Sequence, residues 1–207
     1  MPYAEALALQ RSLVEERRAG AIPDTLLLLE HPHVLTLGVR GDGGRSHILA
    51  TDDALAARGI EIHETGRGGD ITYHGPGQVV GYPIIDLNPD RRDVHRYVRD
   101  LEAVLMGVAA AYGIEAGRIE GLTGVWVGNE KLAAIGVRIA RWITSHGFAL
   151  NVTTELDHFA LIIPCGISDR GVTSLQRLLG RSIDTADVQN LIIEQFAKIF
   201  FFNVLEN

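Results

Sequence analysis

The chain has 207 residues, 46% of them hydrophobic and 22% charged, values typical of one folded globular domain and not of a disordered chain. The net charge of −7 argues against a general affinity for nucleic acid, and no apolar stretch approaches the ~20 residues that span a bilayer. No basic region precedes the first apolar residues, so we expect no secretory signal and a cytoplasmic location.

Periodicity, caps and turn residues predict the elements of the chain. The first part of the chain is expected to form a helix at 3–19, strands at 26–29 and 34–37, a short helix at 52–58 and a strand at 60–63. A glycine-rich segment at 65–78 follows, then a strand at 79–87 and a helix at 94–112 capped by Asp93. The last part is expected to form strands at 125–127, 131–139 and 143–152, a helical stretch at 155–161, a loop at 162–172, and two helices that begin at the N-caps Ser174 and Thr185. Helices and strands mix without regular alternation. We therefore expect a single α+β domain over residues 1–207, with a mainly antiparallel mixed sheet and helices packed on it.

The glycine-rich segment 65–78 holds five glycines and one proline, which let backbone N–H groups approach a ligand closely. In this segment Arg67 could hold an anion in a bidentate manner, and His74 would stand on a rigid corner. The alternative is a tight hairpin with a solvated Arg and His. The segment matches neither the P-loop nor the dinucleotide-binding fingerprint.

Alternation along two neighbouring strands predicts small residues on one face of each. These faces consist of Ala134, Gly136 and Arg138 in the first strand and of Ser145, Gly147 and Ala149 in the second, with His146, Phe148 and Leu150 on the opposite face of the second. If the small faces coincide, they form a shallow apolar floor for a ligand chain. Close packing of a helix on the small residues is an equally good interpretation.

Cysteine and lysine are both scarce: the chain has one cysteine, Cys165, and two lysines, Lys131 and Lys198. Cys165 stands between proline and glycine, in a turn that can present its thiol to a cleft, although a lone cysteine is more often a small buried hydrophobe. Lys131 enters an apolar strand, where a desolvated lysine can lose its proton and an arginine cannot. The alternative role for Lys131 is to protect a strand edge.

Three blocks of the sequence carry a resemblance to a known family. These blocks, RGGDITYHGPGQVVGYPIIDL, GNEKLAAIGVRIARWITSHGFALNV and PCGISDRGVTSL, closely resemble the octanoyltransferases of lipoate biosynthesis. The likeness runs from about Glu30 to Leu175, with minor departures at Ile71 and Leu132.

The resemblance implies an acyltransferase that moves an octanoyl or lipoyl group from acyl carrier protein to a specific lysine of a lipoyl domain. The acceptors would be the lipoyl domains of 2-oxoacid dehydrogenase complexes and the glycine cleavage H protein, in the first step of endogenous lipoate biosynthesis. It also implies a single octanoyltransferase catalytic domain with a fold similar to that of biotin and lipoate protein ligases, using no cofactor and no metal. Neither nucleic acid nor a membrane is an expected partner.

The resemblance also implies residue roles. The family's nucleophile falls on Cys165, which would carry the octanoyl group as a thioester, and its catalytic lysine falls on Lys131, which would lower the pKa of the thiol and pass protons. The substrate-binding residues are Arg67, Gly68, Gly69, Asp70, Ile71, Thr72, Tyr73 and His74, then Ala134, Ile135 and Gly136, and finally Gly147, Phe148 and Ala149. His74 is a second candidate, after Lys131, for orienting the thiol or the carbonyl.

Three other functions compete with this interpretation: an ATP-dependent ligase of lipoate or biotin type, a cysteine acyl-thioester hydrolase that uses Cys165 and His74, and a non-enzymatic domain that binds acyl chains. Docking also needs a local basic surface, because acyl carrier proteins and lipoyl domains are usually acidic and this chain is acidic too. The densest cluster of arginines runs from Arg91 to Arg99 and is a candidate for docking, or simply a solvated helix face.

Overall fold

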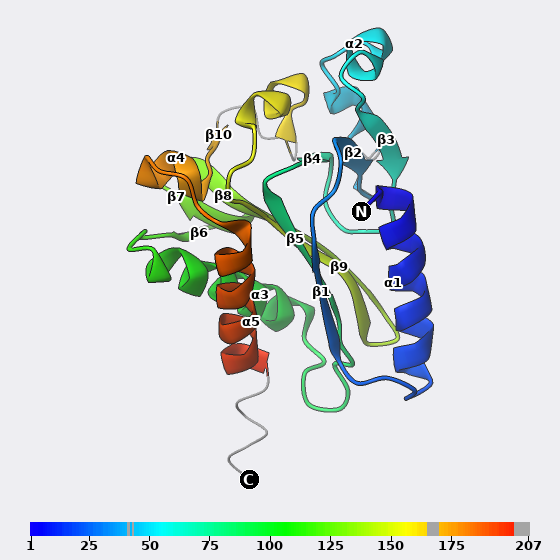
Figure 1. Ribbon diagram of the computed structural model, residues 1–207. Coiled ribbons are helices and arrows are strands. Elements are labelled where there is room, and N and C mark those ends of the chain that lie inside the picture. The colour runs from blue at the N-terminus through cyan, green and yellow to red at the C-terminus, as the bar shows by residue number, and fades with distance from the viewer. Residues whose placement is uncertain (41, 43, 165–169, 201–207) are drawn as a thin grey trace.

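A seven-stranded sheet forms the centre of the computed structural model, which describes residues 1–40, 42, 44–164 and 170–200 (Figure 1). Across the sheet the strands are β1 (Thr25–Leu29), β5 (Gln78–Ile84), β9 (Ile143–Asn151), β8 (Glu130–Ala140), β7 (Leu122–Val127) and β6 (Gly117–Ile119), and β10 (Gly171–Val172) pairs with β8 off this path. Only β10 runs parallel to its neighbour; the other pairs among the described strands of this sheet are antiparallel.

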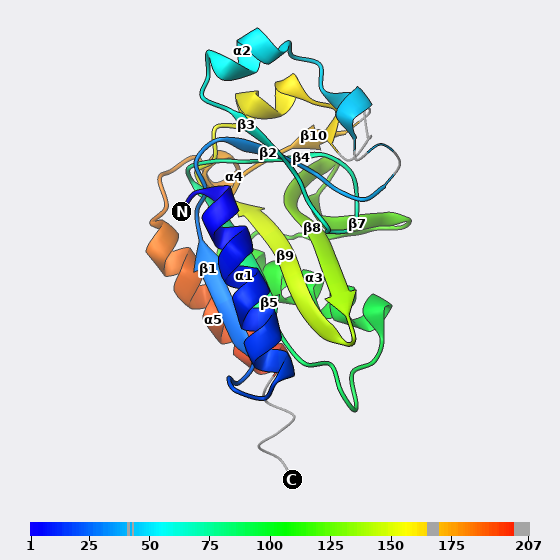
Figure 2. The same cartoon turned by 90° about the vertical axis from the view of Figure 1, so that its right-hand side faces the viewer.

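Helices cover both faces of the sheet. Helix α1 (Tyr3–Arg18) lies on one face, and α3 (Val94–Ala111) and α5 (Thr185–Phe200) lie on the other (Figure 2). The apolar stripe of α3, which includes Leu101, Leu105 and Val108, is fully buried against the sheet and α5 because these residues recur at helical spacing.

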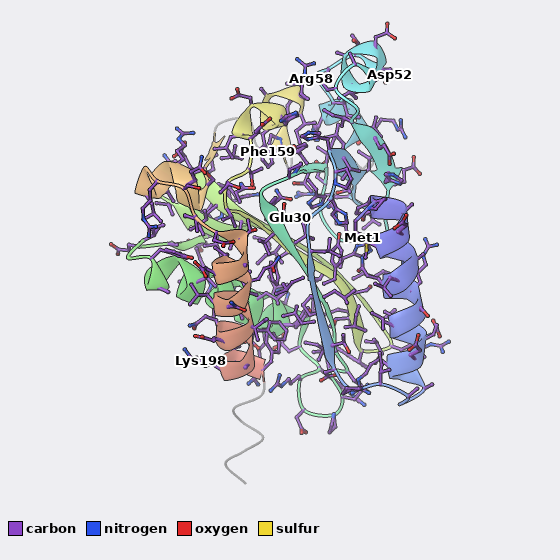
Figure 3. The ribbon with its side chains drawn as sticks, in the orientation of Figure 1. Met1, Glu30, Asp52, Arg58, Phe159 and Lys198 are labelled. Atoms are coloured by element: carbon purple, nitrogen blue, oxygen red, sulfur yellow. The ribbon has the colours of Figure 1, made fainter. Side chains whose placement is uncertain are left out.

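A second, three-stranded sheet lies beyond one end of the large sheet. Its order is β3 (Glu61–Glu64), β2 (Val34–Leu37) and β4 (Thr72–His74), with β2 parallel to β3 and antiparallel to β4. The short helices α2 (Asp52–Ala56), η1 (Arg45–His47) and η2 (Leu156–Leu161) surround it. Phe159 of η2, which is labelled in Figure 3, packs edge-on against Tyr73 of β4 with ring centroids 5.3 Å apart and closes a separate apolar core.

The α+β architecture with a mainly antiparallel sheet is confirmed, as are two of the predicted N-caps. Asp93 accepts a hydrogen bond from the backbone N–H of Arg96, and Ser174 accepts one from Arg177 at the start of α4 (Leu175–Leu179). The predicted N-cap Thr185 is wrong, because Thr185 is already the first residue of α5 and Asp184 accepts the backbone N–H of Ala186. Three strands were missed or misplaced. β4 lies within the glycine-rich segment, β10 lies within the predicted loop, and β6 was not expected. Each has only two or three residues, too few for a periodic pattern to show. No helix in the described part of the chain has both the length and the apolar content of a membrane span.

Candidate functional site

A cavity lies between α1, the floor formed by β8 and β9, and the glycine-rich segment. It is lined by all the predicted substrate-binding residues except Ile71 and Tyr73, together with four residues that were not predicted: Tyr3, Val80, Tyr82 and His146. The segments singled out in the sequence therefore meet in one place.

Ile71 and Tyr73 point away from this cavity. Both are fully buried in the core beneath η2, because side chains alternate along β4 and only Thr72 and His74 face the cavity. The Tyr73 hydroxyl is hydrogen bonded to Nδ1 of His33, 2.7 Å away. These two residues support the cavity wall from behind and do not line it.

The floor of the cavity is built from small residues that face one another across two strands. Ala134 is opposite Ala149 and Gly136 is opposite Gly147 in the register of β8 and β9, so the two small faces coincide. At Gly136 the chain packing against the floor is the glycine-rich segment and not a helix: the Gly68 N–H donates to the Val137 carbonyl at 2.9 Å. A Cβ on Gly136 would lie 2.9 Å from the Gly68 carbonyl oxygen, so this approach requires glycine.

Arg67 is bound to the protein itself. Its Nη2 donates to the backbone carbonyl of Thr36 at 2.5 Å and to the Thr36 hydroxyl at 2.9 Å, and its Nη1 donates to the carbonyl of Gly68 at 3.1 Å. The side chain is buried, with the residue 7% exposed. These donors join the glycine-rich segment to β2, and a bidentate grip of Arg67 on an anion stays a prediction.

His74 belongs to a chain of buried hydrogen bonds. The side-chain N–H of Asn151 donates to the carbonyl of Thr173, so its side-chain oxygen accepts from the side-chain N–H of Gln78. The side-chain oxygen of Gln78 is therefore the atom that accepts from Nδ1 of His74, at 2.7 Å. Nε2 of His74 then accepts from the Thr36 hydroxyl at 3.3 Å. With both ring nitrogens occupied, His74 fixes the wall of the cavity and is poorly placed to orient a reacting thiol or carbonyl.

Three buried histidines around the cavity are neutral at neutral pH. Burial lowers the pKa of His74 to about 3, with the nearby His31 adding to the effect, and burial also lowers the pKa of His31 to about 4. Burial and then the charge of Arg67 lower the pKa of His146 to about 4. Among the described residues, no group of three His, Cys, Asp or Glu side chains is arranged to hold a metal ion.

His146 breaks the alternation of β9. Its φ of 53° lies in the left-handed region, where histidine is among the residues tolerated more often than most. The ring lies edge-on to Tyr82, with centroids 6.3 Å apart, and lines the cavity. The prediction that His146 shares the face of Phe148, away from the small residues, is therefore wrong.

Asp70 connects the cavity to the segment that leads to Cys165. Its carboxylate lies 2.8 Å from Nδ1 of His47 and accepts the backbone N–H of Ile71 at 2.6 Å. The carbonyl of His47 in turn accepts the backbone N–H of Ile163 at 2.8 Å. The last described residues before Cys165 are thus held by the same short helix that binds Asp70.

Lys131 lies inside the large sheet. It is opposite Trp126 of β7 and Val172 of β10, and the residue is only 7% exposed. Its Nζ lies 4.7 Å from the centroid of the Trp126 ring, which is within the range of a cation–π contact. The alternative of a strand-edge lysine is wrong, because β8 has neighbours on both sides here.

Lys131 shares a small cavity with Thr72, Ala134 and Ala149, which also line the larger cavity. Pro164 lines this small cavity too, and Cys165 itself lies outside the described residues. Lys198, the second lysine, is exposed near the end of α5 (Figure 3). The structure therefore brings Lys131, and not Lys198, beside the predicted substrate-binding segments.

Sequence reasoning missed several polar residues of the site. Thr36, Gln78 and Asn151 are buried hydrogen-bonding residues within otherwise apolar strands. Buried polar groups need partners, so a polar residue inside an apolar strand was the available signal. Tyr3 gave no such signal, because nothing in the helical pattern of α1 shows which element it meets.

The chain is similar to known proteins over nearly its whole length. A family model described as the lipoyl protein ligase A/B catalytic domain matches residues 2–197. The octanoyltransferase of Myxococcus xanthus is 55% identical over 204 residues, which are 96% of this chain and 57% of that protein. The octanoyltransferase of Solibacter usitatus is 53% identical over 203 residues, 98% of this chain and 90% of that protein. The chain belongs to the octanoyltransferase family. The family and the acyltransferase class predicted from the three sequence blocks are thus confirmed.

The fold is shared with more distant proteins. A putative lipoate protein ligase from T. acidophilum, solved with bound lipoic acid, aligns with a TM-score of 0.72 at 16% identity over 92% of this chain and 80% of that chain. The expected likeness to lipoate protein ligases is confirmed as a likeness of fold. The likeness to biotin ligases stays a prediction.

Gly136→Ala tests the close packing on the floor of the cavity. We expect the added methyl group to displace residues 67–69, to cost about 1–3 kcal/mol of stability as overpacking does, and to reduce octanoyl transfer. Gly117→Ala in β6 is the matched control, because a Cβ at Gly117 meets nothing within 4 Å. Urea denaturation and a transfer assay measure the two effects. If Gly136→Ala behaved like the control, the packing requirement would be wrong.

The buried histidines predict a loss of stability in acid. The folded pKa values of His31, His74 and His146, about 4, 3 and 4, lie below the value of about 6.5 for an unfolded chain. The unfolded chain therefore binds more protons in this interval. The stabilisation is complete above pH ~6.5 and is lost as the pH falls towards 4. We expect the free energy of unfolding to fall between pH 7 and pH 5, with a weaker dependence in His74→Asn and no change in the slope for His95→Asn at an exposed position. A flat profile for the parent chain would contradict this assignment.

Proposed function

We propose that this chain transfers an octanoyl or lipoyl group from acyl carrier protein to a specific lysine of a lipoyl domain, through a thioester on Cys165. Proposed acceptors are lipoyl domains of 2-oxoacid dehydrogenase complexes and the glycine cleavage H protein, and the proposed compartment is the cytoplasm. The observation that carries the proposal is the position of Lys131, buried in a cavity that it shares with Pro164, the residue before Cys165.

The chemistry requires two acyl transfers. In the first, the Cys165 thiolate attacks the carbonyl carbon of the octanoyl thioester and a new carbon–sulfur bond forms. The carbon–sulfur bond to the carrier breaks, and the carrier leaves as a thiolate that takes up a proton. This exchange of one thioester for another is nearly isoenergetic, so it needs no nucleotide. In the second, the amine of the acceptor lysine attacks the Cys165 thioester, an amide forms, and the carbon–sulfur bond to Cys165 breaks.

Lys131 supplies the proton chemistry in this scheme. A free cysteine has a pKa of about 8.5, and a neighbouring cation favours the thiolate that performs the attack. The amine of the acceptor lysine must lose a proton during the second transfer, and Lys131 or the departing Cys165 thiolate can accept it. An arginine could supply the charge but could not exchange the proton.

The larger cavity is the proposed acyl site. Its floor of Ala134, Gly136 and Ala149 has no side chain longer than a methyl group, and the side chain of Val80 adds apolar surface. An alkyl chain gains about 0.8 kcal/mol for each methylene removed from water. Thr72, Ala134 and Ala149 line this cavity and the one that holds Lys131, which supports a chain that starts near Lys131 and runs along the floor.

The arginines from Arg91 to Arg99 are poorly placed for docking a carrier protein beside Lys131. They flank the start of α3, which follows the Ile84 end of β5 (Figure 1). The strand register places Lys131 at the other end of the large sheet, level with the Gln78 end of β5. Arg91 also donates to the Phe200 carbonyl, and Arg92 donates to the Asn88 side chain at 2.6 Å. The solvated helix-face interpretation fits these residues better than docking.

Intact mass after incubation with octanoyl-acyl carrier protein tests the covalent intermediate. We expect a gain of one octanoyl group, absent in Cys165→Ser, and its transfer to a lipoyl domain on addition of that acceptor. Release of free octanoate without acylated acceptor would support a hydrolase instead. Acylation of the lipoyl domain from free octanoate and ATP, with no acyl carrier protein present, would support a ligase.

Lys131→Arg tests the proton-transfer role. Because the substitution keeps a positive charge and removes the exchangeable proton, we expect transfer to the lipoyl domain to fall by at least ~100-fold, within the range for a lost general acid–base group. Lys198→Arg is the matched control at an exposed position of α5 and should keep the parent rate. A near-normal rate for Lys131→Arg would remove proton transfer from the mechanism.

A further inference from the structure

His146 separates two cavities. It lines the proposed acyl site and also a groove between α1 and the far ends of β8 and β9, with a volume of about 310 Å³, and among the described residues it is the one that lines both. We call the second cavity the α1 groove. Its walls include the apolar side chains of Leu7 and Ile143 and the polar side chain of Gln10.

The backbone of β9 is shaped to put the His146 ring at this boundary. The left-handed φ of 53° turns the side chain to the face that carries Gly147 and Ala149. Helix α1 holds this conformation, because the carbonyl oxygen of the Gln10 side chain accepts the His146 N–H at 2.8 Å. The residue is only 4% exposed. A non-glycine residue in this region is a local cost that surrounding contacts must offset.

The distance along β8 matches an eight-carbon chain. Ala134, which lines both the Lys131 cavity and the acyl site, is three residues from Val137, which lies opposite His146. Three strand residues rise about 10 Å, close to the length of an extended octanoyl chain. A chain whose carbonyl lies near Lys131 and Ala134 therefore ends at the His146 ring.

We propose that His146 sets the longest acyl chain that the site accepts, by closing the acyl site against the α1 groove. This inference rests on the proposed function, because it takes the floor of β8 and β9 as the binding surface for the acyl chain. Octanoyl fits in front of the ring. A longer chain must displace the ring or fold back on itself, and one excess methylene in an apolar pocket costs about 10- to 200-fold in specificity.

The α1 groove explains why closure is needed. Arg11 and Arg138 line the groove and make no hydrogen bond or ion pair with any residue that the structure describes. The Gln10 amide nitrogen is buried there without a partner among the described residues. Leu7 and Ile143 line the same groove and can receive the end of a longer chain once the ring is gone, so the ring and not the groove ends the acyl site. The arginines and the Gln10 amide make the groove a poorer site for an alkyl chain than the floor of β8 and β9, but they do not close it.

His146→Gly is the direct test, because glycine is the residue best suited to a left-handed φ and the fold should survive. We expect kcat/KM for dodecanoyl-acyl carrier protein, relative to octanoyl, to rise at least tenfold while octanoyl transfer remains measurable. His146→Asn keeps a residue that tolerates the same φ with a shorter side chain, and should give a smaller shift in the same direction. Urea denaturation of each variant shows that it is folded.

Arg141→Gly is the matched control, since Arg141 also has a φ of 53° but lies in the exposed turn between β8 and β9. It should keep the parent chain-length profile. A folded His146→Gly protein with an unchanged ratio of dodecanoyl to octanoyl transfer would overturn the role of His146. A parent protein that transferred no acyl group from acyl carrier protein would instead overturn the proposed function, so the two failures are distinguishable.

Discussion

The close approach of the glycine-rich segment to β8 is the contact on which the site depends. Gly68 donates its N–H to Val137, a residue in the middle of the large sheet, and the absence of a side chain at Gly136 makes room for it. Arg67, the residue before Gly68, donates to Thr36 in the small sheet. Two adjacent residues thus join the two sheets, and the cavity is the space that this joint leaves between them and α1.

The walls of the cavity contain more polar side chains than one expects for the binding site of an alkyl chain. The hydrogen bonds from Arg67 through Thr36 and His74 to Gln78 satisfy the buried groups along one wall, so the wall can be dry without leaving donors unpaired. Burial keeps the pKa of His74 far below neutrality, so the ring carries no charge beside the proposed acyl site. Full pairing and neutrality together let polar side chains enclose an apolar ligand at little cost, and they fix its shape more rigidly than flexible aliphatic side chains could.

The sequence predicted those features that repeat along one element. The helical spacing of α3 and the alternation of small residues in β8 and β9 both hold in the structure, because each depends on a backbone period that the residues display directly. It did not predict β4, which has only three residues and lies inside the glycine-rich segment, or the reversal of His146. That reversal depends on Gln10 in α1, which is 136 residues away, and no local pattern can report such a contact. The roles proposed for Cys165 and Lys131 came from the resemblance of the three blocks to a known family, because helical or strand periodicity carries no information about catalytic roles.

The arrangement around Lys131 shows how a fixed sheet can serve a reaction on a neighbouring segment. On one side of Cys165, Ile163 donates its N–H to His47, which binds Asp70 of the cavity wall. On the other side, β10 pairs directly with Lys131, and the Thr173 N–H donates to the Lys131 carbonyl at 3.0 Å. The segments that precede and follow the proposed nucleophile are therefore both hydrogen bonded to parts of the site, the first to the cavity wall through His47 and the second to Lys131. A productive transfer requires the reacting groups to lie within about 1 Å of their proper positions. These hydrogen bonds to the sheet therefore support the proposal that the segment around Cys165 is positioned relative to Lys131.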